Sequence, residues 1–188
     1  MYASLRASKL MIETREAAAL AGKEVAVTLV DADVHPTPKS PDEFKEYIPA
    51  RWRDRNWPQA VYAANFSPLY AAPLGGTPRR GQRIDARPPH GGPTASDPDF
   101  LEKQLFDEVG VDFAILLPLI VRPMANPEHE AAVCAAANAW LTDTWLGRYN
   151  RHGRYRGSLR VSTSLPELAV AEIEQYGGHP HVVQVMLN

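Results

Sequence analysis

The chain has 188 residues, of which 45% are hydrophobic and 22% charged, and its formal net charge is -2. This composition predicts a globular protein that is long enough for one domain with a hydrophobic core. The sequence lacks the clustered Lys and Arg residues that drive nucleic-acid binding, and no apolar run approaches the roughly 20 residues that cross a bilayer. We therefore expect neither nucleic acid nor a membrane as a partner.

The N-terminal residues, 1–24, predict a polar helical extension without the apolar core of a secretory signal. The single cysteine, Cys134, cannot form an internal disulfide and lies in an alanine-rich helical pattern. This pattern favours a buried, reduced thiol over a nucleophile, and a reduced thiol fits a cytoplasmic location.

The first strand is predicted over residues 25–34, where β-branched residues dominate a short run. A long segment rich in Pro, Gly and Arg follows over 36–96, with one short helix that starts near Ser40 or Asp42. Ordered loops of this length often cover active sites. A disordered insertion is the alternative, and the aromatic residues of the segment count against it.

Beyond the loop, helices and strands alternate. Helical periodicity and end signals predict helices over 96–110, 126–147 and 164–178. The first has Ser96 or Asp97 as its cap and an apolar stripe, the second has Asn126 as its cap, and the third has a capping box of Ser164 and Glu167. The stripe consists of Leu101, Leu105, Phe106 and Val109.

Strands are predicted over 111–120, 154–163 and 181–188, and the run "FAILLPLI" is typical of a strand buried on both faces. The β, loop, α, β, α, β, α, β order predicts an α/β fold with a parallel sheet over 25–188. Such a sheet is either open and doubly wound or part of a (β/α)8 barrel. Four strands are too few to close a barrel, which typically needs about 250 residues.

The first predicted strand ends in "DADVHP", which places Asp31, Asp33 and His35 on one face because side chains alternate along a strand. The end of a parallel strand is where catalytic groups lie in α/β proteins. A carboxylate and an imidazole there suit Zn²⁺ or a similar divalent ion. The structural alternative is that the aspartates cap backbone groups and His35 is hydrogen-bonded in the loop.

Five segments together resemble the N-terminal half of the amidohydrolase-related proteins, the group that includes aminocarboxymuconate semialdehyde decarboxylase and the resorcylate-type decarboxylases. These segments are "VDADVHP", "SDPDFLEKQLFDEVGVDFAILLP", "AAANAWLTDTWL", "YRGSLRVSTSLPELAVAEIEQ" and "HPHVVQVML". The resemblance covers roughly residues 26–188. It implies half of a distorted TIM barrel, about four β/α units, with 36–96 as a loop on the active face.

The resemblance further implies one divalent metal, zinc or manganese, with Asp33 and His35 as its first two ligands and Asp31 in a structural role. Such a metal polarises a substrate carboxylate or phenolate, or activates a water. The implied reaction is decarboxylation or hydrolysis of a small, aromatic carboxylic acid. In the loop, His90 could reach this substrate, and Arg83 and Arg87 could bind its carboxylate; solvated surface roles are the alternative for all three.

The family's remaining ligands follow its fifth, sixth and eighth strands, whereas this sequence reaches only the fourth. His179 and His181 precede that strand and are expected at the opposite end of the sheet. His129 and His152 are expected in capping or solvated roles. Both edges of a four-stranded half would be unpaired. Three alternatives stay open: two copies complete the barrel, a second chain completes it, or the sequence is a truncated part of a longer enzyme. The alternative function is a non-catalytic half-barrel remnant or interaction module.

Overall fold

The computed structural model describes residues 27–54, 84–119 and 124–187, and it is an α/β structure built on one four-stranded sheet. The predicted extension over 1–24 and the central part of the 36–96 loop lie outside these residues. Within the described residues, no helix is long and apolar enough to span a membrane.

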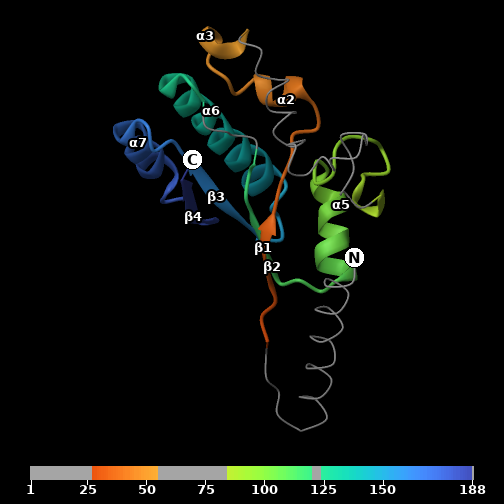
Figure 1. Cartoon of the computed structure of the whole chain (residues 1–188). Helices are drawn as coiled ribbons and strands as arrows, with labels where there is room; N and C mark the ends of the chain where they lie inside the picture. Colours follow the sequence, from red (N-terminus) through yellow and green to blue (C-terminus); the bar gives the residue numbers. More distant parts are fainter. Residues whose placement is uncertain (1–26, 55–83, 120–123, 188) are drawn as a thin grey trace, which may run out of the picture.

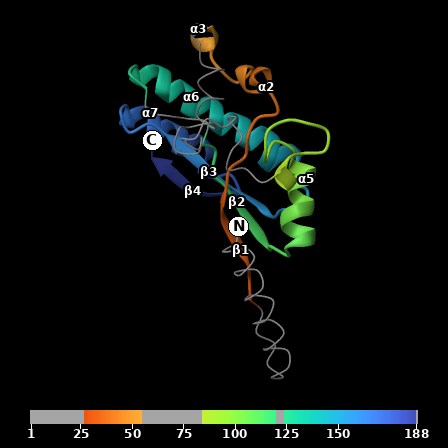
Figure 2. The ribbon, with the colours of Figure 1, turned by 45° about the vertical axis from the view of Figure 1, so that its right-hand side comes forward.

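The sheet is parallel throughout, and its strands lie side by side in chain order, β1-β2-β3-β4 (Figures 1 and 2). This confirms the predicted α/β alternation. Because neighbouring strands are also consecutive in the chain, right-handed crossovers place the connecting helices on one face of the sheet. The strands are β1 (Val30–Val34), β2 (Phe113–Leu116), β3 (Tyr155–Val161) and β4 (Val182–Leu187).

The helices precede or connect these strands, and two of them continue as π-helices. The early loop holds two short helices where the sequence predicted one. The helical segments are α2 (Pro41–Lys45), α3 (Ala50–Arg53), the 3₁₀ turn η1 (Ile84–Ala86), α5 (Pro98–Glu102) with η2 (Lys103–Glu108), α6 (Pro127–Trp140) with η3 (Leu141–Arg148), and α7 (Pro166–Tyr176).

Most of the predicted helix starts are confirmed, because capping is a local interaction. The side chains of Ser40, Asp97 and Asn126 each accept a hydrogen bond from a backbone N–H in the first turn of the following helix. The capping box at the start of α7 is wrong: Leu165 is the N-cap residue, and no side chain caps the helix.

Two strand predictions also need correction. β1 starts at Val30 rather than at residue 25. β2 alternates between half-buried and buried residues, so it is not covered on both faces. The helices pack on one face of the sheet, and in β2 the residues of the other parity, Phe113 and Ile115, are only half-buried.

The core lies between the sheet and the helices. Ala114 and Leu116 of β2 are fully buried, and Tyr155 of β3 packs against Phe106 with ring centroids 5.2 Å apart. Val109 departs from the predicted stripe, since it is 44% exposed. The helix continues as a π-helix after Glu102, which changes the angle between successive side chains and turns Val109 away from the core.

Two asparagine side chains complete the hydrogen bonding of β3, the longest of the described strands. Asn138 on α6 donates to the Arg160 carbonyl (2.8 Å) and accepts from the Arg160 N–H (2.7 Å). Asn150 bonds the backbone of Tyr155 in the same two-point way, at 3.1 and 3.0 Å. Each amide therefore replaces a strand neighbour where β3 is unpaired.

The sheet register explains both positions. The last β2 partner of β3 is Leu116, opposite Gly157, so β3 extends past β2 at Arg160. On the other side, β4 begins with Val182 opposite Gly157, so Tyr155 precedes the start of β4. A buried backbone amide without a partner is costly, and the two side chains remove that cost.

Candidate functional site

The predicted site lies at the carboxyl ends of β1 and β2. Asp33 is the fourth residue of β1, and His35 follows its last residue. The imidazole Nε2 of His35 is 3.2 Å from Oδ1 of Asp33, and the two side chains are 37% and 82% exposed. The structure thus brings the two side chains together on one side of the strand, at an end that is open to solvent.

The orientation of the His35 ring is set by the neighbouring strand. Nδ1 of His35 lies 3.1 Å from the carbonyl oxygen of Leu117, directly after β2. A carbonyl can only accept, so Nδ1 is the donor in this hydrogen bond. In the neutral ring Nε2 then carries a lone pair, and this lone pair faces the Asp33 carboxylate.

This geometry places two hydrogen-bond acceptors 3.2 Å apart. Either a proton on Nε2 or a cation shared by both atoms makes the contact favourable. Two donor atoms at about 2.0–2.2 Å from a tetrahedral zinc ion are roughly 3.3–3.5 Å apart, within a few tenths of an ångström of the observed distance. Histidines that bind a metal also usually donate the N–H of their other ring nitrogen to an acceptor such as a backbone carbonyl.

The neighbouring side chain of Asp31 interacts with the backbone of β1. Oδ1 of Asp31 accepts a hydrogen bond from the backbone N–H of Asp33 at 3.1 Å, which supports the structural role expected for Asp31. Within the described ranges, no group of three or more His, Cys, Asp or Glu side chains is arranged to hold a metal ion. Asp33 and His35 therefore offer two ligands, and further ligands would have to come from outside the described residues.

The loop residues predicted to bind substrate are only partly described. Arg83 lies outside the described residues. The loop is held beside the chain that follows His35, because the Thr37 N–H donates to the Ala95 carbonyl at 2.8 Å. His90 is exposed and Arg87 is half-buried. No described hydrogen bond or ion pair connects them to the Asp33–His35 pair.

Two other histidines are more enclosed than the sequence predicted. His129 stacks on Trp52 with ring centroids 4.6 Å apart and an interplanar angle of 9°. The side chain of His152 is 17% exposed and packs edge-on against Phe106 and Tyr155. Burial lowers the pKa of His152, which keeps its ring neutral in this aromatic setting. The solvated alternative is therefore wrong for His152, whose Nδ1 accepts a hydrogen bond from the backbone N–H of Arg154 at 3.0 Å, in keeping with the capping alternative. His129 is half-buried.

His179 and His181 precede β4, at the opposite end of the sheet from Asp33, as predicted. Their ring centroids are 5.7 Å apart, and Nδ1 of His181 is 3.3 Å from the guanidinium of Arg156. Burial and this positive neighbour lower the pKa of His181. The position of the two rings excludes them as ligands to an ion held by Asp33 and His35.

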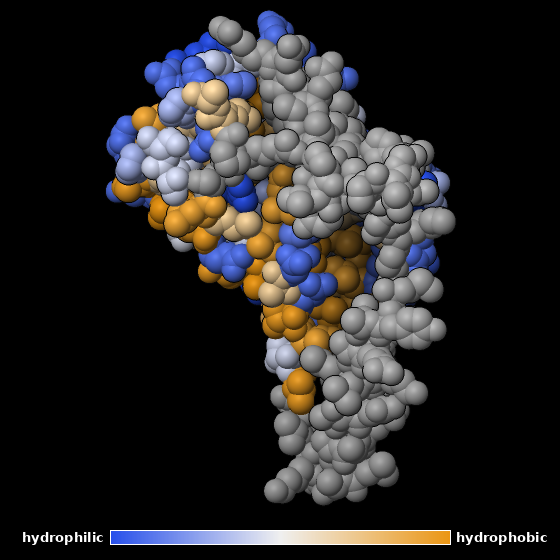
Figure 3. All heavy atoms as spheres, viewed as in Figure 1, coloured by the Kyte–Doolittle hydropathy of each residue, from blue (hydrophilic) through white to orange (hydrophobic). Residues whose placement is uncertain are grey.

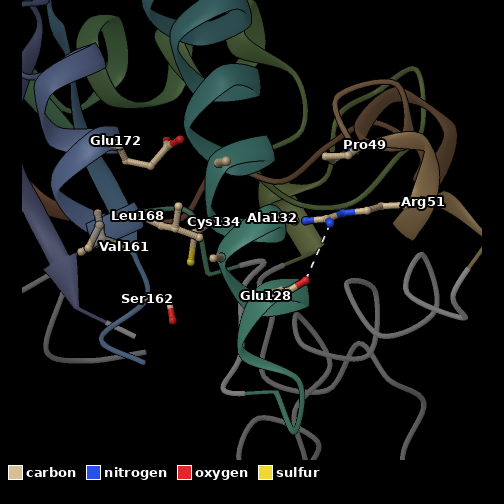
Figure 4. Close-up of a pocket in the computed structure, with 13 residues that line it drawn as sticks. Pro49, Arg51, Glu128, Ala132, Cys134, Val161, Ser162, Leu168 and Glu172 are labelled. Atoms are coloured by element: carbon tan, nitrogen blue, oxygen red, sulfur yellow. Dashed lines mark ion pairs between the residues drawn. The ribbon is translucent and has the colours of Figure 1, made fainter. Parts of the chain in front are cut away.

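A cavity of about 230 Å³ lies between α6 and α7, at the carboxyl end of β3 (Figure 4). Its wall includes Cys134, Ser162, Leu168 and Glu172, and an ion pair between Arg51 and Glu128 lies at its other side. Burial raises the pKa of Cys134 to about 12, so the thiol stays protonated. The prediction of a buried, free thiol at Cys134 is confirmed.

Sequence reasoning missed the polar residues around this cavity. Oε2 of Glu172 accepts a hydrogen bond from Asn138 at 2.8 Å, and the buried hydroxyl of Ser162 donates to Glu130 at 2.6 Å. The partners are 34 and 32 residues apart in the chain, so no local pattern pairs them. These groups join α6 to β3 and α7, and they lie on the helical side of the sheet.

No protein-family model matches this chain, and no curated protein matches it. The function is therefore inferred from the geometry at Asp33 and His35 and from the motifs that resemble a known family.

Proposed function

We propose that this chain is the N-terminal portion of a divalent-metal-dependent enzyme of the amidohydrolase type, with Asp33 and His35 as the first two ligands of zinc or manganese. The enzyme would be a decarboxylase or hydrolase of a small, aromatic carboxylic acid. The β1-β2-β3-β4 sheet would then form the first half of a TIM barrel.

The observation that carries this proposal is the contact between Nε2 of His35 and Oδ1 of Asp33 at 3.2 Å. The Leu117 carbonyl holds the other ring nitrogen, so the lone pair of Nε2 and the carboxylate face the same small volume. A divalent cation stabilises such a pair and suits a mixed oxygen and nitrogen ligand set.

The position of the pair supports the same proposal. Parallel α/β sheets place their chemistry at the carboxyl ends of the strands, and in TIM barrels the active site is built from the loops that follow. Asp33 and His35 lie at this end, and the 84–97 segment is bonded beside them through Thr37 and Ala95. The strands lie in sequential order and the helices cover one face of the sheet. This arrangement is typical of a barrel rather than of a doubly wound sheet.

A metal bound there would polarise a carboxylate or phenolate oxygen, or lower the pKa of a bound water. The residues of this chain would hold and orient the ion: Asp33 supplies a charged oxygen, and the Leu117 carbonyl fixes the ring of His35. Arg83, Arg87 and His90 would bind the substrate carboxylate from the loop. The acid or base of the reaction would come from outside the described residues.

Metal titration tests the ligand assignment. Isothermal calorimetry with ZnCl₂ and MnCl₂ should show one ion bound per chain. Asp33→Asn and His35→Gln should each weaken binding by about tenfold or more, since even outer-shell partners of metal ligands contribute 10- to 100-fold. His179→Gln, at the opposite end of the sheet, is the matched control and should bind like the wild type. Equal affinity in all four proteins would refute the assignment.

A non-catalytic half-barrel module that needs a partner is the second candidate. The apolar residues exposed at the edges of the sheet favour it. The same titration separates the two candidate functions, because a wild-type chain that binds neither zinc nor manganese would leave the non-catalytic module as the remaining candidate.

A further inference from the structure

Basic side chains gather at the amino-terminal end of the sheet, opposite to the candidate metal site. His181 directly precedes β4, His179 lies two residues earlier, and Arg156 is the second residue of β3. The N–H of Gly157 donates to the His181 carbonyl at 2.8 Å, so strand pairing holds the three basic residues side by side. Around the strands, Figure 3 shows hydrophobic residues with hydrophilic ones between them. We name His179, His181 and Arg156 the basic cluster.

Hydrogen bonds fix the tautomer of both histidine rings. Nδ1 of His179 accepts from the backbone N–H of His181 at 3.2 Å, and Nδ1 of His181 accepts from the guanidinium of Arg156 at 3.3 Å. A backbone N–H and a guanidinium can only donate, so in the neutral rings each Nδ1 carries the lone pair and each Nε2 carries the proton. Both Nε2 atoms are therefore hydrogen-bond donors, which suit an anion and not a metal cation.

The guanidinium of Arg156 has further donors. Within the described residues, all its hydrogen bonds are made by Nη1, to the carbonyls of Gly153 and Tyr155 and to His181. Its central carbon lies 4.7 Å from the ring centroid of Phe113, a cation–π contact that helps to hold it in place. Nε and Nη2 thus keep N–H groups for a ligand, and a guanidinium edge of this kind suits two oxygens of one oxyanion.

The positive charge of the basic cluster is not neutralised by a carboxylate in the described part of the chain. Burial lowers the pKa of His181, and the charged groups that shift this pKa, which are the other two members of the cluster and His152, all lower it further. Nearby acidic side chains have other partners. Oε2 of Glu102 lies 3.6 Å from Nε2 of His152, and Oδ2 of Asp112 accepts from the Leu29 N–H at 2.7 Å. A bound anion would supply the negative charge.

We propose that the basic cluster binds phosphate, either as the free ion or as the phosphate group of a small molecule. Phosphate has more charge and more acceptor oxygens than a carboxylate, so it matches donors that come from three side chains.

The phosphate site is independent of the proposed enzyme function. It lies at the end of the sheet opposite to Asp33 and His35, so it does not depend on metal binding there. It is also compatible with a longer protein, since further strands of a barrel would pair beside β4 and β1, whereas the basic cluster lies at the amino ends of β3 and β4.

Isothermal calorimetry with sodium phosphate, at pH 7 in EDTA and at constant ionic strength, tests the site. The wild type should bind one phosphate per chain. Arg156→Gln and His179→Gln should each weaken binding by about tenfold or more, since a hydrogen bond to a charged group contributes about that factor. Arg51→Gln is the matched control: it removes the same charge from an exposed ion pair with Glu128 and should bind phosphate like the wild type.

Far-UV circular dichroism verifies that each variant is folded. Should Arg156→Gln fail to fold, His179→Gln still tests the site, because glutamine keeps an acceptor for the His181 N–H. Glycerol 3-phosphate separates the two forms of the ligand. Tighter binding than that of inorganic phosphate would indicate a phosphorylated small molecule, and weaker binding would indicate the free ion; either result supports the site.

A second measurement locates the bound ion. In NMR titrations of the histidine ring protons, phosphate should raise the pKa of His179 and His181, because a nearby negative charge favours the protonated ring. The pKa of His129, which stacks on Trp52, should stay unchanged. Three results would overturn the proposal: no phosphate binding by the wild type, binding that Arg156→Gln and His179→Gln leave intact, or acetate bound as tightly as phosphate.

Discussion

Replacing Asn138 by leucine should destabilise the fold far more than an ordinary asparagine substitution. Leucine has a similar size but offers no hydrogen bond, so the buried N–H and C=O of Arg160 would each lose the hydrogen bond that Asn138 makes. Asn138 is 0% exposed, so water cannot replace it. Each buried backbone group left unsatisfied costs about 1–3 kcal/mol, which gives about 2–6 kcal/mol for the pair.

This loss is a large share of the total stability of a domain, which is about 5–15 kcal/mol. Urea unfolding followed by tryptophan fluorescence would measure it, because Trp140 and Trp145 are 0% and 1% exposed and report on the core. Asn150→Leu should show a loss of the same size, since Asn150 makes the same pair of bonds to Tyr155.

Asn126→Ala provides the control. Asn126 is exposed and caps α6 with one hydrogen bond, so its removal should cost about 1 kcal/mol. If Asn138→Leu and Asn150→Leu cost no more than Asn126→Ala, the side chains do not replace strand neighbours, and the account of the β3 ends is refuted.

Two further changes test the packing of the helices on β3. Glu172→Gln should raise the melting temperature at pH 8 but not at pH 4.5. Burial raises the pKa of Glu172 above its ordinary 4.5, so the folded state binds the proton more tightly than the unfolded state does. The stability that this proton contributes is lost as the pH rises through the raised pKa. An equal effect at both pH values would contradict this. Gly157→Ala should lower the unfolding free energy by about 1–3 kcal/mol, because its Cβ would lie 2.6 Å from Cδ1 of Leu146 and 3.2 Å from Cδ2 of Leu141. Gly178→Ala, which meets no atom within 4 Å, should show no such loss in the same thermal scans.

Local signals in the sequence were enough to predict most of the helices and strands. Asn126 caps the helix it was predicted to cap, and Ser40 and Asp97 are each one of the two candidates predicted for their helices, because a cap and its N–H donor are three residues apart. The failure at Ser164 shows the limit of such signals: the spacing of a capping box is present, but Leu165 occupies the N-cap position. The metal, the substrate and the partners proposed from the sequence remain predictions.

The candidate site also has one feature that local sequence predicts and one that depends on tertiary structure. Alternation along one strand predicted that Asp31, Asp33 and His35 would share a face. The side chains of Asp33 and His35 meet at 3.2 Å, whereas a register shift between Asp31 and Val34 interrupts the alternation that was expected to place Asp31 beside them. The Leu117 carbonyl that orients His35 is 82 residues away in the chain. No pattern within β1 indicates that acceptor, because strand pairing brings it there.

By itself, the sequence determined the alternation of strands and helices, the ends of most helices and the shared face of Asp33 and His35, since these depend on residues within a turn or two of each other. Only the tertiary structure decided that Asn138 and Asn150 complete β3, that His129 and His152 pack against aromatic rings, and that the hydrophobic surface stays exposed at β4. These features depend on which elements become neighbours in space, and that choice is made by the packing of the whole chain.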